Sequence, residues 1–178
     1  MSRLLGRPTN PMTVAQSTKA IAPARSLRRE AQFNVLIVRC ANEWFALPAA
    51  SVVHVSRVTK VHALPHRTSV GFRGLTALSG AVVPVIDLIA LLGLRLGDES
   101  LARNARMVTV GDAHAPFAFE ADDVPGVYAI AHSALQSLPL TVESAPKRIS
   151  SGLLMTPHGT ASLIDPERLF AEFRSALA

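Results

Sequence analysis

The sequence has 178 residues, of which 49% are hydrophobic and 17% are charged. This length fits one domain or two small ones with a buried core, and the low charged fraction leaves apolar surface for partners. Cys40 is the single cysteine, which excludes an internal disulfide and fits a reducing compartment. It lies in an apolar run, so we predict a buried and inert thiol.

The net charge of +5 belongs to the start of the chain. Residues 1–30 contain six basic side chains and one acidic side chain, whereas residues 31–178 contain twelve of each. A nucleic-acid-binding body should carry its own basic patch, so the neutral body argues against that function. We interpret residues 1–30 as a disordered basic N-terminal extension, because they lack hydrophobic periodicity.

Nothing in the sequence predicts export or membrane insertion. Residues 1–30 lack the apolar core of a secretory signal. No stretch reaches the roughly 18 apolar residues of a membrane-spanning helix. We therefore expect a cytoplasmic protein.

The body begins with short strands separated by turns. A β-branched strand over 33–40 is followed by a turn and a return strand over 44–47, with Trp44 and Phe45 predicted in the core. Residues 48–51 break that strand, and the next one leads from Val52 to near Val61.

The stretch 74–93 carries the most informative pattern in the first half. Two apolar strands, 75–78 and 81–86, flank a Ser79-Gly80 turn in which Gly80 supplies a positive φ. The second strand is nearly all apolar, which predicts burial on both faces, and Pro84 indicates an edge or a bulge. Asp87 is predicted to cap a helix of about one turn, which Gly93 ends.

The same pattern recurs near the end of the chain, with strands at 152–155 and 161–164, a turn at His158-Gly159 and a cap at Asp165. Pro166 at the first helical position strengthens that cap and opens a C-terminal helix over 166–177. Five residue pairs are 78 positions apart, namely Gly74 and Gly152, Leu75 and Leu153, Ile86 and Ile164, Asp87 and Asp165, and Leu91 and Leu169. Three further pairs are 72 positions apart, namely Phe45 and Phe117, Val52 and Val124, and Val55 and Val127.

These repeats indicate an internal duplication, with a six-residue insertion between Ile130 and Gly152 in the second copy. Each copy offers about five short strands, which suits a small closed barrel that protects its edges. We predict a mainly β fold with two small five-stranded SH3-like β-barrel subdomains, short helices and a C-terminal helix. The subdomain halves are roughly 31–94 and 105–175, and a groove between them is the expected binding surface.

The quoted patterns resemble the CheW-like domain family of bacterial chemotaxis coupling proteins. The resemblance covers about residues 31–175, and the Val-Val-Pro-Val-Ile-Asp-Leu run over 82–88 is its most specific part. The chain also resembles the family in the patterns W-F-A-L-P over 44–48 and V-V-H-V over 52–55. The family fold is two five-stranded barrel subdomains.

This resemblance implies a non-catalytic adaptor that couples the cytoplasmic tip of methyl-accepting chemoreceptors to a CheA-type histidine kinase. No cofactor, metal or nucleic acid is implied. The implied receptor-facing residues are Val52, His54, Val55, Gly74, Ser79 and Gly80, and Val61 is implied on the kinase side. The family usually has Asn-Leu-Arg-Gly where this chain has Ala77-Leu78-Ser79-Gly80, which implies a different receptor or a specialised chemosensory system, such as one for twitching or surface sensing.

The sequence also raises three alternative interpretations. A small-barrel nucleic-acid binder that uses the basic extension is the alternative function. An aspartic-protease-like pair of Asp87 and Asp165 lacks the Asp-Thr/Ser-Gly context, so we expect both to be helix caps. His62 and His66 have a four-residue spacing without further ligands, so exposed loop histidines are expected rather than a metal site.

Overall fold

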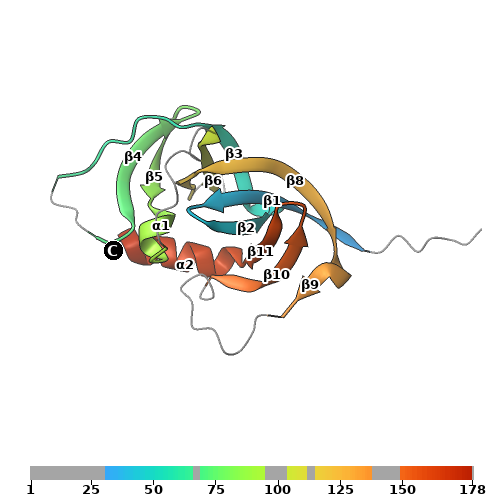
Figure 1. The fold of residues 1–178 in the computed structure, drawn as a ribbon. Helices are drawn as coiled ribbons and strands as arrows, with labels where there is room; N and C mark the ends of the chain where they lie inside the picture. Colours follow the sequence, from blue (N-terminus) through green and yellow to red (C-terminus); the bar gives the residue numbers. More distant parts are fainter. Residues whose placement is uncertain (1–30, 66–68, 95–103, 112–114, 138–148, 178) are drawn as a thin grey trace, which may run out of the picture. The chain divides into compact units, whose positions relative to one another are not determined.

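Two β-sheets and a C-terminal helix organise the part of the chain that the structure describes (Figure 1). The computed structural model describes residues 31–65, 69–94, 104–111, 115–137 and 149–177, so the extension at 1–30 and His66 lie outside the described residues. The strands are β1 (Gln32–Cys40), β2 (Glu43–Pro48), β3 (Val52–Arg57), β4 (Phe72–Leu78), β5 (Ala81–Ile86), β6 (Arg106–Val110), β7 (Phe117–Ala121), β8 (Asp123–Ala131), β9 (Leu135–Gln136), β10 (Ser150–Thr156) and β11 (Gly159–Ile164). The helices are α1 (Leu88–Leu91), α2 (Pro166–Leu177) and the short 3-10 helices η1 (Ala49–Ser51) and η3 (His132–Ala134).

Each sheet surrounds its own small apolar cluster, which gives the two barrels expected from the sequence. One sheet has six strands rather than the predicted five, because the two-residue strand β9 pairs at its edge. Barrel A has the strand order β8-β1-β2-β11-β10-β9, and barrel B has the order β3-β6-β7-β5-β4. The cluster of barrel A consists of Val35, Ile37, Ala46, Leu154, Ala161 and Leu163. The cluster of barrel B consists of Leu78, Val83, Val85, Met107 and Ala118.

A third and larger core joins the two barrels. Alternate side chains of the same strands point into it, because successive side chains of a strand face opposite sides. Leu36 and Val38 of β1 and Val108 and Val110 of β6 belong to this core, as does Phe45, which is 1% exposed. Helix α2 contributes Leu169, Phe173 and Ala176.

The barrels do not coincide with the sequence halves 31–94 and 105–175. Barrel A combines β1 and β2 of the first half with β8 to β11 of the second, and Figure 1 shows β2 beside β11. Barrel B combines β3, β4 and β5 with β6 and β7 of the second half. The prediction of one barrel per half was therefore wrong. Each copy contributes one hairpin to the other copy's barrel, a choice of partner that local sequence patterns do not encode.

The strand registers confirm the internal duplication. The β4–β5 pairing shifts register between Phe72 and Gly74, and the β10–β11 pairing shifts between Ser150 and Gly152, 78 positions later. Each barrel also has one parallel strand pairing, and the two pairings correspond. Val85 pairs with Ala118 in barrel B, and Leu163 pairs with Ala46 in barrel A, which are the same positions under the 78- and 72-residue offsets.

Several local predictions need correction. Strand β5 lies between β7 and β4 rather than at an edge, and Pro84 is tolerated there because the parallel pairing with β7 is limited to Val85 and Ile86. Strand β5 is also not buried on both faces, since Val82 is 70% exposed. The second hairpin turns at Pro157-His158, one residue earlier than expected.

Trp44 is also placed differently from the prediction. It is only partly buried at the edge of the barrel A cluster, whereas Phe45 reaches the central core. Neighbouring residues of one strand point to opposite faces, so the two aromatic side chains cannot share one core.

Candidate interaction surface

A shallow apolar groove opens at one end of barrel B. Its volume is about 140 Å³, and its lining comes from four neighbouring parts of the barrel. The lining residues are Val53, His54, Leu78, Ser79, Ala81, Val83, Thr109 and Pro116. The groove therefore brings together two residues that the sequence analysis singled out, His54 and Ser79.

Strand β3 presents two consecutive side chains to the groove because of a register shift. Its pairing with β6 slips between Val52 and His54, which allows both Val53 and His54 to line the groove. Val52 and Val55 are partly buried and pack against the central core. They support the groove from below and do not line it.

The turn between β4 and β5 forms another part of the groove wall. Ser79 has φ 50° and Gly80 has φ 82°, so both turn residues are left-handed, as in a type I′ hairpin. The sequence analysis assigned a positive φ only to Gly80. Ala77, Ser79 and Gly80 are all exposed.

Gly74 is buried and has a structural role in this position. A Cβ atom there would lie 2.3 Å from the carbonyl oxygen of His62. The close approach permits the bridge in which the His62 amide donates to Leu75 O at 2.8 Å and the Leu75 amide donates to His62 O at 2.9 Å. His62 is exposed, in line with the expectation of a loop histidine.

Val61 packs against the apolar cluster of barrel B. Its side chain is partly buried, whereas Val58 and Leu64 on the same loop are 41% and 39% exposed. The loop around Val61 therefore offers apolar surface mainly through these two neighbours.

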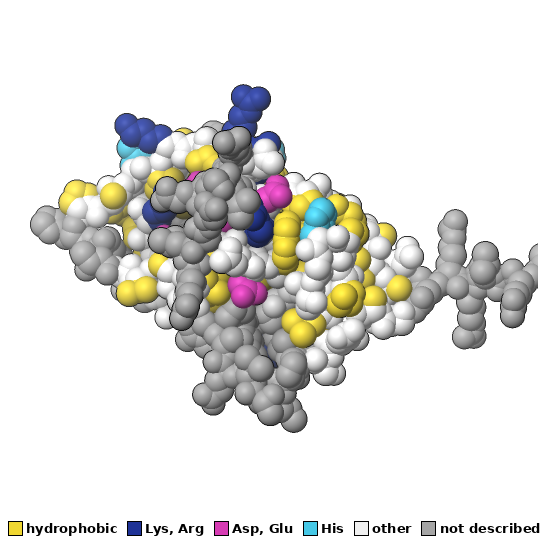
Figure 2. Space-filling model, viewed as in Figure 1, with side chains coloured by type: hydrophobic (Ala, Val, Ile, Leu, Met, Phe, Trp, Pro, Cys, Tyr) yellow, Lys and Arg dark blue, Asp and Glu magenta, His cyan; other side chains and the backbone are white. Residues whose placement is uncertain are grey.

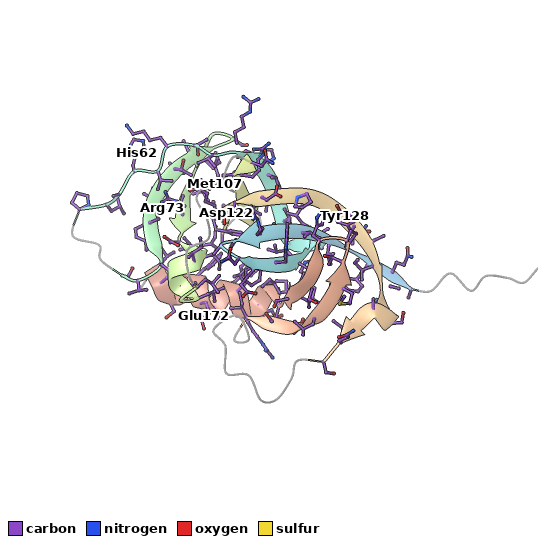
Figure 3. All side chains as sticks on the ribbon, in the orientation of Figure 1. His62, Arg73, Met107, Asp122, Tyr128 and Glu172 are labelled. Carbon is purple, nitrogen blue, oxygen red and sulfur yellow. The ribbon has the colours of Figure 1, made fainter. Side chains whose placement is uncertain are left out.

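A larger polar pocket of about 410 Å³ lies near the start of α1. Arg73 and Asp122, both labelled in Figure 3, line it together with Asp87 and Glu120. Arg73 forms an ion pair with Glu120, and Asp122 accepts a hydrogen bond from the Ala41 amide at 2.6 Å. These carboxylates already have ion-pair or hydrogen-bond partners within the protein.

Both candidate acidic residues cap helices, as predicted. Asp87 Oδ1 accepts a hydrogen bond from the Ala90 amide at 2.9 Å. Asp165 Oδ1 accepts from the amides of Glu167 at 3.0 Å and Arg168 at 3.3 Å. Each carboxylate satisfies amides that the first helical turn leaves unpaired.

Cys40 is completely buried, as the sequence predicted. Burial raises the pKa of its thiol well above the ordinary range, and the nearby carboxylates of Asp122 and Asp87 raise it further. The neutral thiol is a poor nucleophile.

Within the described residues, no cluster of three or more His, Cys, Asp or Glu side chains could hold a metal ion. The same residues include no helix with the length and apolar character needed to span a bilayer.

The comparison with known families covers nearly the whole described unit. The model of the CheW-like domain matches residues 34–174. The chain belongs to the CheW-like domain family. The probable chemotaxis protein CheW of Rhizobium etli is 26% identical to this family member over 149 residues, which cover 81% of the chain and 91% of that protein.

A solved structure supports the CheW-like fold. The scaffolding protein TtCheW from Thermoanaerobacter tengcongensis matches with a TM-score of 0.65 and 19% sequence identity, over 76% of this chain and 90% of that one. Membership of the CheW-like family confirms the resemblance and the expected chemotaxis coupling role, and it does not favour the nucleic-acid alternative.

Of the eight lining residues, sequence reasoning named only His54 and Ser79 as contact residues. Thr109 and Pro116 lie in no recognised motif and come from the second copy, whereas Val53 lies within the V-V-H-V pattern but was not named as a contact residue. The 72-residue repeat could have found Pro116, since it occupies the position that Trp44 has in the first copy.

Proposed function

We propose that this protein is a non-catalytic adaptor that couples the cytoplasmic tip of a methyl-accepting chemoreceptor to a CheA-type histidine kinase. It acts in the cytoplasm, within a bacterial chemosensory complex. The observation that carries the proposal is an open apolar groove, built by β3 and the β4–β5 turn, in a chain whose residues 34–174 match the CheW-like domain.

The chemistry of the groove favours a protein partner. Its walls are mainly aliphatic. Val53 in the lining is 51% exposed, and Val82, between the lining residues Ala81 and Val83, is 70% exposed. On the face shown in Figure 2, exposed hydrophobic side chains lie among basic, acidic and histidine side chains. Such a mixed surface is typical of protein interfaces rather than of a nucleic-acid-binding face.

We assign the receptor contact to the groove side and the kinase contact to the loop near Val61. His54, Ser79 and Gly80 lie on the exposed surface of the groove side, while Val52, Val55 and Gly74 hold it in place. The side chains of Ala77 and Ser79 carry neither the amide group of asparagine nor the guanidinium group of arginine. The receptor bound here should therefore differ from one that requires those groups.

The catalytic alternative has little support in the described residues. Asp87 and Asp165 are engaged as helix caps, and the Cys40 thiol is buried and protonated. An adaptor acts through binding alone and needs no activated nucleophile.

A reconstitution tests the proposal. The full chain is mixed with the histidine kinase and a receptor cytoplasmic fragment from the same bacterium, and both co-sedimentation and kinase autophosphorylation are measured. We expect the chain to bind each protein and to make kinase activity depend on the receptor. Binding of neither protein would refute the proposal, and salt-dependent binding of single-stranded DNA by residues 31–178 would favour the alternative.

A further inference from the structure

Pro116 in the lining of the barrel B groove occupies the position in its barrel that Trp44 occupies in barrel A. The two barrels are related by the internal duplication, so each residue of one can be matched to a residue of the other. Trp44 matches Pro116 at 72 positions, Tyr128 matches Ser56 at the same offset, and His158 matches Gly80 at 78 positions.

In barrel A, the three larger residues form one cluster in which Trp44 and Tyr128 both contact His158. Trp44 packs against the barrel cluster and stacks on His158, with ring centroids 5.1 Å apart. The Tyr128 hydroxyl lies 2.9 Å from His158 Nε2, within hydrogen-bond distance, and Tyr128 is labelled on β8 in Figure 3. An aromatic side chain of the protein itself therefore packs against the apolar cluster of barrel A.

In barrel B, each of these three positions has a smaller residue, and one of the three, Pro116, lines the groove. Proline, serine and glycine replace tryptophan, tyrosine and histidine. A dry cavity of roughly 150 Å³ can hold a benzene molecule, so a groove of about 140 Å³ has room for one aromatic ring.

The buried hydroxyl of Thr109 is a second observation that points to a ligand in the groove. Thr109 is 4% exposed, and its hydroxyl has no hydrogen-bond partner among the described residues. The matching residue in barrel A is Ile37, which is completely buried in the apolar cluster. Burying an unpaired hydroxyl is unfavourable, so a threonine at this core position suggests a partner that supplies the missing hydrogen bond.

We propose that the groove of barrel B binds one aromatic side chain with a polar group, of the tyrosine or tryptophan type, from the chemoreceptor tip. This side chain takes the place that Trp44 has in barrel A, and its polar group bonds with the Thr109 hydroxyl. Tyrosine and tryptophan suit the site because each combines a large apolar body with a hydrogen-bonding tip. The inference rests on the proposed function, because it takes the receptor as the partner.

The main test variant places tryptophan at position 116, because tryptophan occupies the matching position 44 in barrel A. Receptor-fragment and kinase affinities are measured for the full-length wild type, Pro116→Trp, Thr109→Val and a control, Val70→Trp. Val70 is 74% exposed and lies outside the groove lining, so the control adds the same indole elsewhere. Circular dichroism and thermal melting check that each variant is folded.

We expect Pro116→Trp to weaken receptor binding at least tenfold and to leave kinase binding unchanged. Thr109→Val should weaken receptor binding about three- to tenfold, the effect of one lost hydrogen bond, without loss of stability. Val70→Trp should bind as the wild type does. Thr109→Val keeps the inference testable if Pro116→Trp does not fold.

Other outcomes separate this inference from the proposed function. If the wild type binds the receptor and neither groove variant binds it more weakly, the inference is wrong while the proposed function stands. If the groove variants lose kinase binding instead, the occupant named here is wrong. If the wild type binds neither protein, the proposed function fails, and the receptor-side occupant fails with it.

Discussion

Ala46 on β2 pairs in parallel with Leu163 on β11, a residue from the other copy of the duplicated unit. This pairing, and the matching one between Val85 and Ala118, ties each barrel to both halves of the chain. The fold is therefore an exchange of hairpins between two copies and not two barrels in series.

The exchange predicts that neither half folds alone. Fragments 31–94 and 95–178 should each be largely unfolded by circular dichroism, because each barrel would lack strands and expose its cluster. An equimolar mixture should regain strand signal, since the missing strands come from the other fragment. A cooperative thermal transition in either isolated fragment would contradict this prediction.

Gly74 should tolerate no side chain. Gly74→Ala places a Cβ atom 2.3 Å from His62 O at φ 144°, so we expect a loss of about 2–5 kcal/mol in unfolding free energy. Gly80→Ala is the matched control, since a Cβ there meets nothing within 4 Å and only its φ of 82° is unfavourable, at about 1 kcal/mol. Urea denaturation of the two variants measures the difference, and equal losses would show that the close contact is unimportant.

Two buried threonines should respond in opposite directions to loss of the hydroxyl. Thr109→Val removes an unpaired group, and we expect it to stabilise the protein by about 1 kcal/mol. Thr76→Val should destabilise it by about 1–2 kcal/mol, because Thr76 hydrogen bonds with Thr59 Oγ1 at 2.8 Å and donates to Lys60 O at 2.9 Å. Chemical denaturation of both variants tests the pair, and a destabilised Thr109→Val would mean that its hydroxyl is already satisfied.

Loss of the α2 cap should cost more than loss of the α1 cap. Asp165→Ala removes an acceptor for two amides and a side chain paired with Arg168 at 3.3 Å, and we expect a loss of about 1–2 kcal/mol. Asp87→Ala removes one amide acceptor from a helix of four residues and should cost about 1 kcal/mol or less. Asp165→Asn, which keeps a capping oxygen, should restore most of the stability in thermal melts.

The Cys40 thiol should resist modification until the protein unfolds. Its pKa is raised by burial and by two carboxylates, so it stays protonated and inaccessible at pH 8. A thiol reagent should react only after denaturant is added. Immediate reaction in the native state would contradict the burial of Cys40.

The same raised pKa gives a pH dependence of stability. Above about pH 8.5 the unfolded thiol loses its proton while the folded thiol keeps it, so the unfolding free energy should fall as pH rises. Cys40→Ala should reduce this slope between pH 8 and pH 10. Equal slopes for the two proteins would show that Cys40 does not contribute to it.

Local sequence patterns account for the individual hairpins and helix caps of this protein. The hairpin over β4 and β5 and the caps at Asp87 and Asp165 follow from turn glycines, alternating apolar residues and carboxylates placed before helices, all of which act within a few residues. The duplication was also readable, because two copies keep the same spacing of the same residue types.

Which strands are neighbours and which surface stays open depend on packing across the whole body of the protein. Ala46 and Leu163 meet because burying both copies' apolar faces favours exchanged hairpins, a preference spread over the whole core and absent from any short pattern. The groove depends on that exchange, since Thr109 and Pro116 come from one copy and His54 and Ser79 from the other. Contacts between distant residues are set by global packing, so the sequence could name His54 and Ser79 but not the site that they form.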